Sequence, residues 1–216
     1  MMAKTNFKIF FLGILAGVAI AFGSLAFILT KSAGSSILGS VAFSIGLLLV
    51  CFLGLNLYTG KIGFVLDKQE MFGVLLLLTY LGNIVGAVAT GYLCYLAFKD
   101  MEGVMNVVHS TTGIRTIGEG DSWYRALIMS IFCGVFVFLA VYGYKKFTNP
   151  GMKAFAIIFC VFIFVVTGME HTIANMVYFS FGNDWSWRAL LNILITTAGN
   201  SLGSILTYAA VKVTGK

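Results

Sequence analysis

The sequence predicts an all-α membrane protein with six transmembrane helices in two inverted three-helix repeats, and three observations lead to this prediction. Of the 216 residues, 59% are hydrophobic and only 10% are charged, whereas about a quarter of the residues in soluble domains are charged. Several apolar runs are long enough to cross a bilayer as helices. Two short polar motifs also occur twice, at corresponding places in the two halves of the chain.

Four apolar runs predict simple spanning helices. A helix needs about 20 apolar residues to cross the hydrocarbon core. The first run is too long for the apolar part of a signal peptide and precedes no small-residue cleavage site, so we expect it to be a span. The four runs are Phe7–Leu29, Phe72–Phe98, Tyr124–Tyr144 and Ala189–Val213.

Two longer runs, Ser36–Leu66 and Ala154–Phe181, predict the second and fifth spans. As continuous helices they would reach about 40–45 Å, well beyond a hydrocarbon core of about 30 Å. Each contains a polar, glycine-bearing stretch near its middle, "GLNLYTGKIG" in the first and "TGMEHTIAN" in the second. We therefore expect both helices to be broken.

The repeat is indicated by matching motifs. The third span contains "LGNIVGA" (Leu81–Ala87) and the sixth "AGNSLGS" (Ala198–Ser204), and the fourth and sixth spans begin alike, with "DSWYRAL" and "DWSWRAL". Three spans per half give the halves, about residues 1–110 and 111–216 of a single channel domain, opposite orientations. Paired broken helices in inverted repeats form midplane sites in many transporters.

The cations predict a protein of the cytoplasmic membrane with both termini in the cytoplasm. Six spans place nine lysines on the side of the termini and five cations on the other, and cytoplasmic loops carry the excess of such residues. The net charge of +6 is explained by lipid headgroups, so we expect no nucleic-acid partner. The nine lysines are Lys4, Lys8, Lys61, Lys68, Lys145, Lys146, Lys153, Lys212 and Lys216.

Glu170 and His171 lie side by side within the fifth apolar run. Ionisable residues in a membrane are expensive and usually face an interior or a pathway. Because adjacent side chains point in different directions, we expect Glu170 to support the loop, by accepting N–H groups or by staying protonated. His171 would then face a pore and donate a hydrogen bond or a proton. The alternative is a histidine satisfied in a helix contact.

Backbone freed by a helix break must be satisfied by protein or by a watery pore. Asn83 and Asn200 are candidates for this task because their amides both donate and accept; plain Gly-xxx-Gly helix packing is the alternative. Thr59 is a second pore-lining candidate, and Leu57, Tyr58 and Phe164 are candidates for apolar constrictions. The half-helix that follows each break points free N–H groups at the midplane, which favours an anion.

Other classes of function find little support. The four cysteines lie apart in apolar runs without a CxxC partner, and His109, expected in the loop between spans three and four, has no ligand cluster around it. No hydrolase or phosphate-binding motif occurs. We therefore expect no enzyme, no metal site and no cofactor. A structural or sensory membrane protein remains a further alternative.

Three motifs resemble the formate/nitrite transporter family: "EHTIANM" (Glu170–Met176), "LYTG" (Leu57–Gly60) and "GNSLGS" in the sixth span. The resemblance implies a homopentamer of aquaporin-like protomers, each with its own pore for small monovalent anions. His171 would match the family's central histidine, Thr59 its loop threonine, and Asn175 the asparagine one turn beyond the histidine. The constriction positions would be Leu57, Tyr58 and Phe164.

The chain departs from the family pattern at three places. Asn56, which we group with the loop-supporting residues, stands where members usually carry an acidic residue, and Gly134 stands where an asparagine commonly follows cysteine. Arg115 is the nearest cation to a lysine often found ahead of the fourth helix. These departures resemble a divergent branch associated with hydrosulfide, HS⁻. We therefore predict an HS⁻ channel, with formate, nitrite and chloride as further candidate anions; the alternative is a proton-coupled secondary transporter of formate or nitrite.

Overall fold

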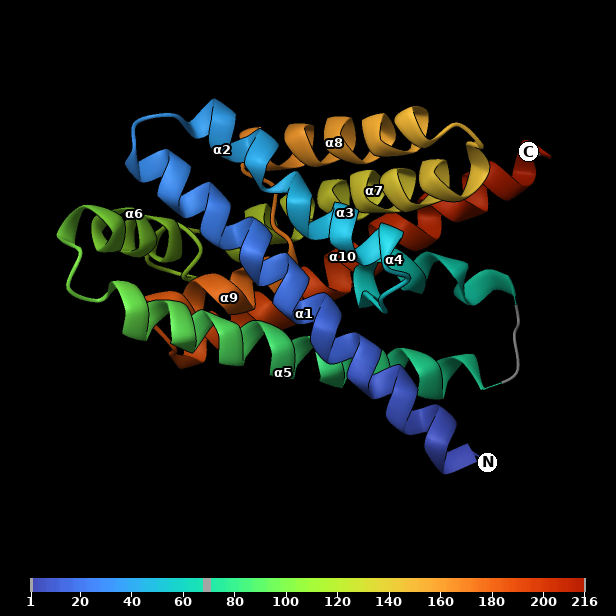
Figure 1. The fold of residues 1–216 in the computed structure, drawn as a ribbon, viewed down its shortest axis with the longest axis horizontal. Helices are drawn as coiled ribbons and strands as arrows, with labels where there is room; N and C mark the ends of the chain where they lie inside the picture. The colour runs from blue at the N-terminus through green and yellow to red at the C-terminus, as the bar shows by residue number, and fades with distance from the viewer. Residues whose placement is uncertain (1, 68–70, 216) are drawn as a thin grey trace.

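The computed structural model describes residues 2–67 and 71–215, and in these ranges the chain is helical apart from loops and one isolated bridge between Ile117 and Asp121. Lys68 and Lys216, counted above for orientation, lie outside these ranges. The helices lie lengthwise beside one another, and α1 begins at the same end of the bundle at which α10 finishes (Figure 1). The elements are α1 (Met2–Ser32), α2 (Ser36–Ala42), α3 (Ser44–Phe52), α4 (Tyr58–Lys61), the 3₁₀ helix η1 (Ile62–Asp67), α5 (Phe72–Phe98), α6 (Glu102–Gly113), α7 (Trp123–Lys146), α8 (Pro150–Val166), α9 (Thr172–Gly182) and α10 (Trp187–Val213).

The four runs expected to form simple spans are the helices α1, α5, α7 and α10. Within the described ranges these four helices are long and apolar enough to cross a membrane. The run Phe72–Phe98 matches α5 at both ends, and the others differ from their helices by a few residues. Hydrophobic run length is therefore sufficient to locate these elements.

The two longer runs are interrupted. The first forms α2 and α3, which meet at Phe43, and then leaves helical geometry at residues 53–57 before α4 and η1; the second leaves it at residues 167–171, between α8 and α9. The second residue of each interruption is a left-handed glycine, Gly54 at φ 65° and Gly168 at φ 71°. The next residue then closes the helix end by a hydrogen bond typical of a Schellman motif: Leu55 N–H to Val50 O at 2.8 Å, and Met169 N–H to Phe164 O at 2.9 Å.

One helix was not anticipated. The segment expected to be a loop between spans three and four contains α6, which lies at the end of the bundle away from the termini (Figure 1). It is short and amphipathic, and it buries Val104, Met105 and Val108. His109 on α6 contacts Asp184, its Nδ1 lying 3.0 Å from Asp184 Oδ2.

Glycines allow the long helices to approach closely. A Cβ added to Gly13 of α1 would lie 2.8 Å from the carbonyl oxygen of Thr79 in α5, and one added to Gly82 would lie 2.9 Å from the Cα of Gly13. In the other half, a Cβ on Gly134 of α7 would collide with the backbone of Asn200 in α10. In lipid the hydrophobic effect does not drive helices together. Small residues at such crossings allow close van der Waals packing, which stabilises the helix pair instead.

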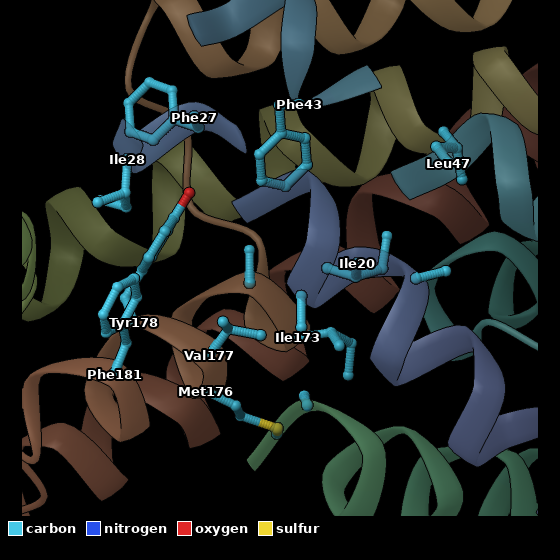
Figure 2. Close-up of a cluster of buried hydrophobic side chains, with 14 of the residues drawn as sticks. Ile20, Phe27, Ile28, Phe43, Leu47, Ile173, Met176, Val177, Tyr178 and Phe181 are labelled. Carbon is cyan, nitrogen blue, oxygen red and sulfur yellow. The ribbon is translucent and has the colours of Figure 1, made fainter. Parts of the chain in front are cut away.

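The buried core surrounds α9. Every residue of this 11-residue helix is buried, although its neighbour α8 has many exposed side chains. Ile173 of α9 lies beside Ile20 of α1, and Tyr178 of α9 points toward Phe27 of α1 (Figure 2). The second interruption is thereby placed in the interior of the bundle, with His171 directly before α9.

Candidate functional site

The two interruptions meet at Thr59 and His171. Thr59 Oγ1 lies 2.9 Å from His171 Nε2, and the two residues are 0% and 3% exposed. His171 also caps α9, because its Nδ1 accepts the N–H of Ala174 at 3.2 Å. A backbone N–H can only donate, so the neutral ring carries its proton on Nε2 and donates it to Thr59. The hydroxyl hydrogen of Thr59 is then available to a third group.

Asn83 holds the first interruption from α5. Its Nδ2 donates to the carbonyl oxygens of Gly13 and Asn56, each at 2.8 Å, and its Oδ1 accepts the N–H of Tyr58 at 2.8 Å. The amide therefore connects α1, α5 and the loop while it satisfies two backbone groups that the break leaves open.

Asn200 makes the same set of contacts around the second interruption. Its Nδ2 donates to Ser130 O and Glu170 O, each at 2.8 Å, and its Oδ1 accepts the N–H of Thr172 at 2.9 Å. Both asparagines are fully buried. Each buried amide uses both N–H hydrogens and its oxygen in hydrogen bonds. A buried donor or acceptor without a partner costs free energy, so these bonds hold the loop in one conformation.

Asn56 ties the first interruption to α1 as well. Its Nδ2 donates to Ile9 O at 3.2 Å, and its backbone N–H donates to Leu12 O at 3.3 Å. An acidic side chain has no N–H to donate to a carbonyl oxygen. An asparagine at this position can therefore donate to the carbonyl oxygen of Ile9, whereas an ionised acidic residue could not.

Glu170 lies in a buried polar cluster with Arg115 and Asn175. Asn175 Nδ2 donates to Glu170 Oε2 at 2.6 Å, and Arg115 Nε lies 3.5 Å from the same oxygen and 3.1 Å from Asn175 Oδ1. Arg115 is 8% exposed and also donates to Thr111 O at 2.9 Å. The guanidinium neutralises the carboxylate. Sequence reasoning named Arg115 only as a departure from the family pattern and did not identify it as the partner of Glu170.

A cavity opens on either side of the Thr59–His171 pair. The Lys61 cavity, of about 200 Å³, is lined by Lys61, Lys145, Tyr144, Leu57 and other residues of α3, α4 and α7. The Lys31 cavity, of about 180 Å³, is lined by Lys31, Arg115, Thr111 and other residues near the α1–α2 connection. A small chamber of about 20 Å³ adjoins the Lys31 cavity and reaches His171 and Asn175.

Apolar side chains separate both cavities from the central pair. On the Lys31 side, Phe27, Phe43 and Phe164 line the small chamber. Phe43 meets Phe164 edge to face at 5.7 Å, and Phe164 stacks on His171 at 6.0 Å between ring centroids. On the Lys61 side, Leu57 lines the cavity and is 2% exposed. Phe27 and Phe43 were missed, because single phenylalanines in apolar runs carry no distinguishing signal.

Tyr58 lies beside this row of cavities. Its ring packs on Tyr80 at 4.8 Å between centroids, and its hydroxyl lies 3.0 Å from Ser201 Oγ. The described residues that line the three cavities do not include it. The Tyr58 ring points toward α5 because the Tyr58 N–H donates a hydrogen bond to Asn83 of that helix.

The family profile and the related sequences that match this chain all describe formate or nitrite transporters and channels. The profile of the family "Formate/nitrite transporter" matches residues 1–214. A "Probable formate transporter" of Methanothermobacter thermautotrophicus is 29% identical over 94% of this chain and 87% of its own length. "Formate channel FocA" of Escherichia coli is 29% identical over 80% of this chain and 65% of its own length, so the match spans slightly less than two thirds of that protein. "Nitrite transporter NirC" of the same species is 30% identical over 74% of this chain and 64% of its own length.

Solved structures show the same fold. A chain described as "FNT family ion channel" superposes with a TM-score of 0.85 over 100% of this chain and 92% of its own, at 21% identity. A chain described as "Pentameric formate channel with formate bound" gives a TM-score of 0.85 over 99% and 98%, at 20% identity. The likeness at this identity concerns the arrangement of the helices.

Proposed function

Because this chain belongs to the formate/nitrite transporter family, we propose that it is a channel for small monovalent anions, with HS⁻ as its physiological ion. The observation that carries the proposal is the position of the Thr59–His171 pair. This polar pair is buried between two cation-bearing cavities and is separated from each by apolar side chains. Such a row attracts an anion, removes its water and offers it a hydrogen-bond donor.

We propose that Ser36–Leu66 and Ala154–Phe181 each complete one membrane crossing, which gives six crossings in two inverted halves of a single domain. The matched contacts of Asn83 and Asn200 support this arrangement, since each binds the loop of its own half in the same way. The termini face the cytoplasm in this proposal, as the lysine distribution favours. The likeness to a chain described as pentameric supports a homopentamer with one pore per protomer.

Each residue of the row has a separate task in the proposed mechanism. Lys31 and Arg115 on one side, and Lys61 and Lys145 on the other, raise the local concentration of anions. Phe43, Phe164 and Leu57 form the constrictions at which the anion loses water. The tautomer of His171 leaves the Thr59 hydroxyl hydrogen for the anion, so Thr59 replaces part of the lost hydration shell.

The structure around the pair also supports HS⁻ over more strongly hydrated anions. The chamber beside His171 has a volume of only about 20 Å³ and an aromatic wall, so the ion must shed nearly all of its water there. HS⁻ is small and weakly hydrated, which lowers the energetic cost of this step. Arg115, Asn56 and Gly134, at which the chain departs from the commoner family pattern, fit their present contacts, and Gly134 in particular leaves no space for a side chain against Asn200.

Flux measurements with purified protein in vesicles test the proposal. Anions are presented one at a time, as HS⁻, formate, nitrite and chloride, and empty vesicles provide the background. We expect the fastest flux for HS⁻ and a loss of flux in His171→Ala and Thr59→Ala. Unchanged rate and selectivity in both variants would refute the site assignment. Accumulation against a concentration gradient, driven by a pH difference, would instead identify the alternative, a proton-coupled transporter.

A further inference from the structure

The Lys61 cavity gathers positive charge without an opposing acid. Lys61 of α4 and Lys145 of α7 both line it, and no carboxylate is among its described lining residues. Within the described ranges neither lysine forms an ion pair with Asp or Glu. Asp67, at the end of η1, is engaged by the Tyr208 hydroxyl at 2.7 Å and by Lys212 at 3.1 Å.

The cavity on the other side differs in this respect. The Lys31 cavity is also lined by two cations, Lys31 and Arg115. However, Arg115 lies 3.5 Å from Glu170, which offsets its charge. The Lys61 cavity therefore presents two cations that form no ion pair, and the Lys31 cavity presents one. Asp67 acts on Lys145 only from a distance, since its carboxylate is engaged by Lys212 and Tyr208.

The Lys145 side chain and the Lys61 backbone are both held in place. The Lys145 ammonium lies 3.6 Å from the centre of the Phe64 ring, a close cation–π contact. Lys61 follows the buried Thr59 and Gly60 on the short helix α4. A cation held against an aromatic ring, beside a second lysine on a buried helix, loses less side-chain freedom on binding an anion than mobile surface lysines do.

The Lys61 cavity is large enough to hold a small anion together with part of its hydration shell. Its volume is about 200 Å³, which corresponds to the volume that about seven water molecules occupy in the liquid, at ~30 Å³ each. Beyond it the path narrows at Leu57, which is 2% exposed. The cost of removing water from an ion rises with the square of its charge, so a dianion is stopped at a constriction that a monovalent anion can pass.

From these observations we infer that the Lys61 cavity is a binding site for a small inorganic dianion, such as sulfate or hydrogen phosphate, which blocks monovalent flux from that side without crossing. The inference rests on the proposed channel function for its effect on flux, while the binding itself does not depend on it. The site makes the protein sensitive to the divalent anions present on the side of its termini.

Binding is tested first, on purified protein in detergent. Sulfate should raise the unfolding temperature in a saturable manner, and sodium chloride at equal ionic strength should not. Lys145→Gln should need at least about tenfold more sulfate for the same effect, since one of two charges is lost. Lys145→Arg should keep the effect. Lys146→Gln, a change at the adjacent residue that does not line the described cavity, is the matched control and should behave as wild type.

Flux is tested next, in vesicles sorted by the direction of insertion. Sulfate on the Lys61 side should reduce monovalent flux, and sulfate on the Lys31 side should have little effect at the same concentration. Equal block from both sides, equal weakening in the Lys145→Gln and Lys146→Gln variants, or a thermal shift no larger than that of chloride would overturn the inference. Saturable binding in a protein that passes no anion would leave the site standing and reject the proposed function.

Discussion

Thr59 Oγ1 lies 2.9 Å from His171 Nε2, although the two residues are 112 positions apart in the chain. Each residue belongs to a different interrupted helix, and each is placed by a separate set of contacts. Asn83 binds the backbone beside Thr59, and Asn200 binds the backbone beside His171. The distance between the two side chains therefore depends on how both halves of the protein pack.

The hydroxyl of Thr59 is expected to be needed for flux, apart from the shape of the side chain. Thr59→Val keeps the volume but removes the donor, and Thr59→Ser keeps the donor. A hydrogen bond to a charged group contributes about 1.5–3 kcal/mol, so flux in the valine variant should fall roughly 10- to 100-fold. Anion flux in vesicles measures this effect. Similar rates for the valine and serine variants would show that only the volume matters.

The buried pair of Arg115 and Glu170 is expected to be coupled in stability. Arg115→Met leaves a carboxylate that is 1% exposed without its cation, which should lower the free energy of unfolding by about 3–5 kcal/mol. Adding Glu170→Gln removes the stranded charge and should restore most of that loss. Denaturant unfolding of both single variants and the double variant completes the cycle. Additive losses would contradict the coupling.

Asn83 and Asn200 are expected to contribute similarly to stability. Replacing either by alanine removes three buried hydrogen bonds. At about 0.6–1 kcal/mol for each bond, the loss should be about 2–3 kcal/mol. Asn106→Ala, on the exposed face of α6, is the matched control and should change stability little. A much smaller loss for one buried asparagine would show that its loop finds other partners.

The contact of Asp67 with α10 predicts a pH dependence. The hydrogen bond from the Tyr208 hydroxyl, and with it the Lys212 ammonium, lowers the pKa of the Asp67 carboxyl. A lowered folded-state pKa gives stability that is present above the unfolded value, about 3.9, and lost as the pH falls through the folded value. Asp67→Asn should therefore melt below wild type at pH 7, and the two melting temperatures should approach each other below about pH 4. A constant difference across this range would exclude the linkage.

The sequence predicted best those elements whose structure is restricted by the lipid bilayer. Run length predicted α1, α5, α7 and α10, and excess length with internal glycine predicted that the two other runs would be interrupted, because a bilayer restricts helix length and forbids unpaired backbone. The amphipathic helix α6 was missed, since a short surface helix with mixed polarity resembles a loop in hydropathy. The bend at Phe43 was missed as well, because no glycine or proline marks it.

Most residues of the candidate site could be named from the sequence, but their geometry could not. His171, Thr59, Glu170 and the asparagines stood out as polar residues in apolar surroundings. Arg115 was not recognised as a partner of Glu170, because it lies 55 positions before it in the chain and only tertiary packing brings the two together. Tyr58 was predicted to form a constriction because it lies in the LYTG motif, yet its ring packs against Tyr80. The direction of the ring follows from a backbone contact, which the sequence pattern does not reveal.

The asparagine contacts also have a consequence for the order in which the protein is assembled. Asn83 follows Asn56, whose carbonyl it binds, by 27 residues, and Asn200 follows Glu170 by 30. During synthesis each interrupted helix therefore leaves the ribosome before the side chain that completes it. Until α5 or α10 has joined the bundle, open carbonyl and N–H groups need water or helper proteins. A nascent chain halted between these elements should thus expose the backbone of its interrupted helix, until the asparagine amide binds it.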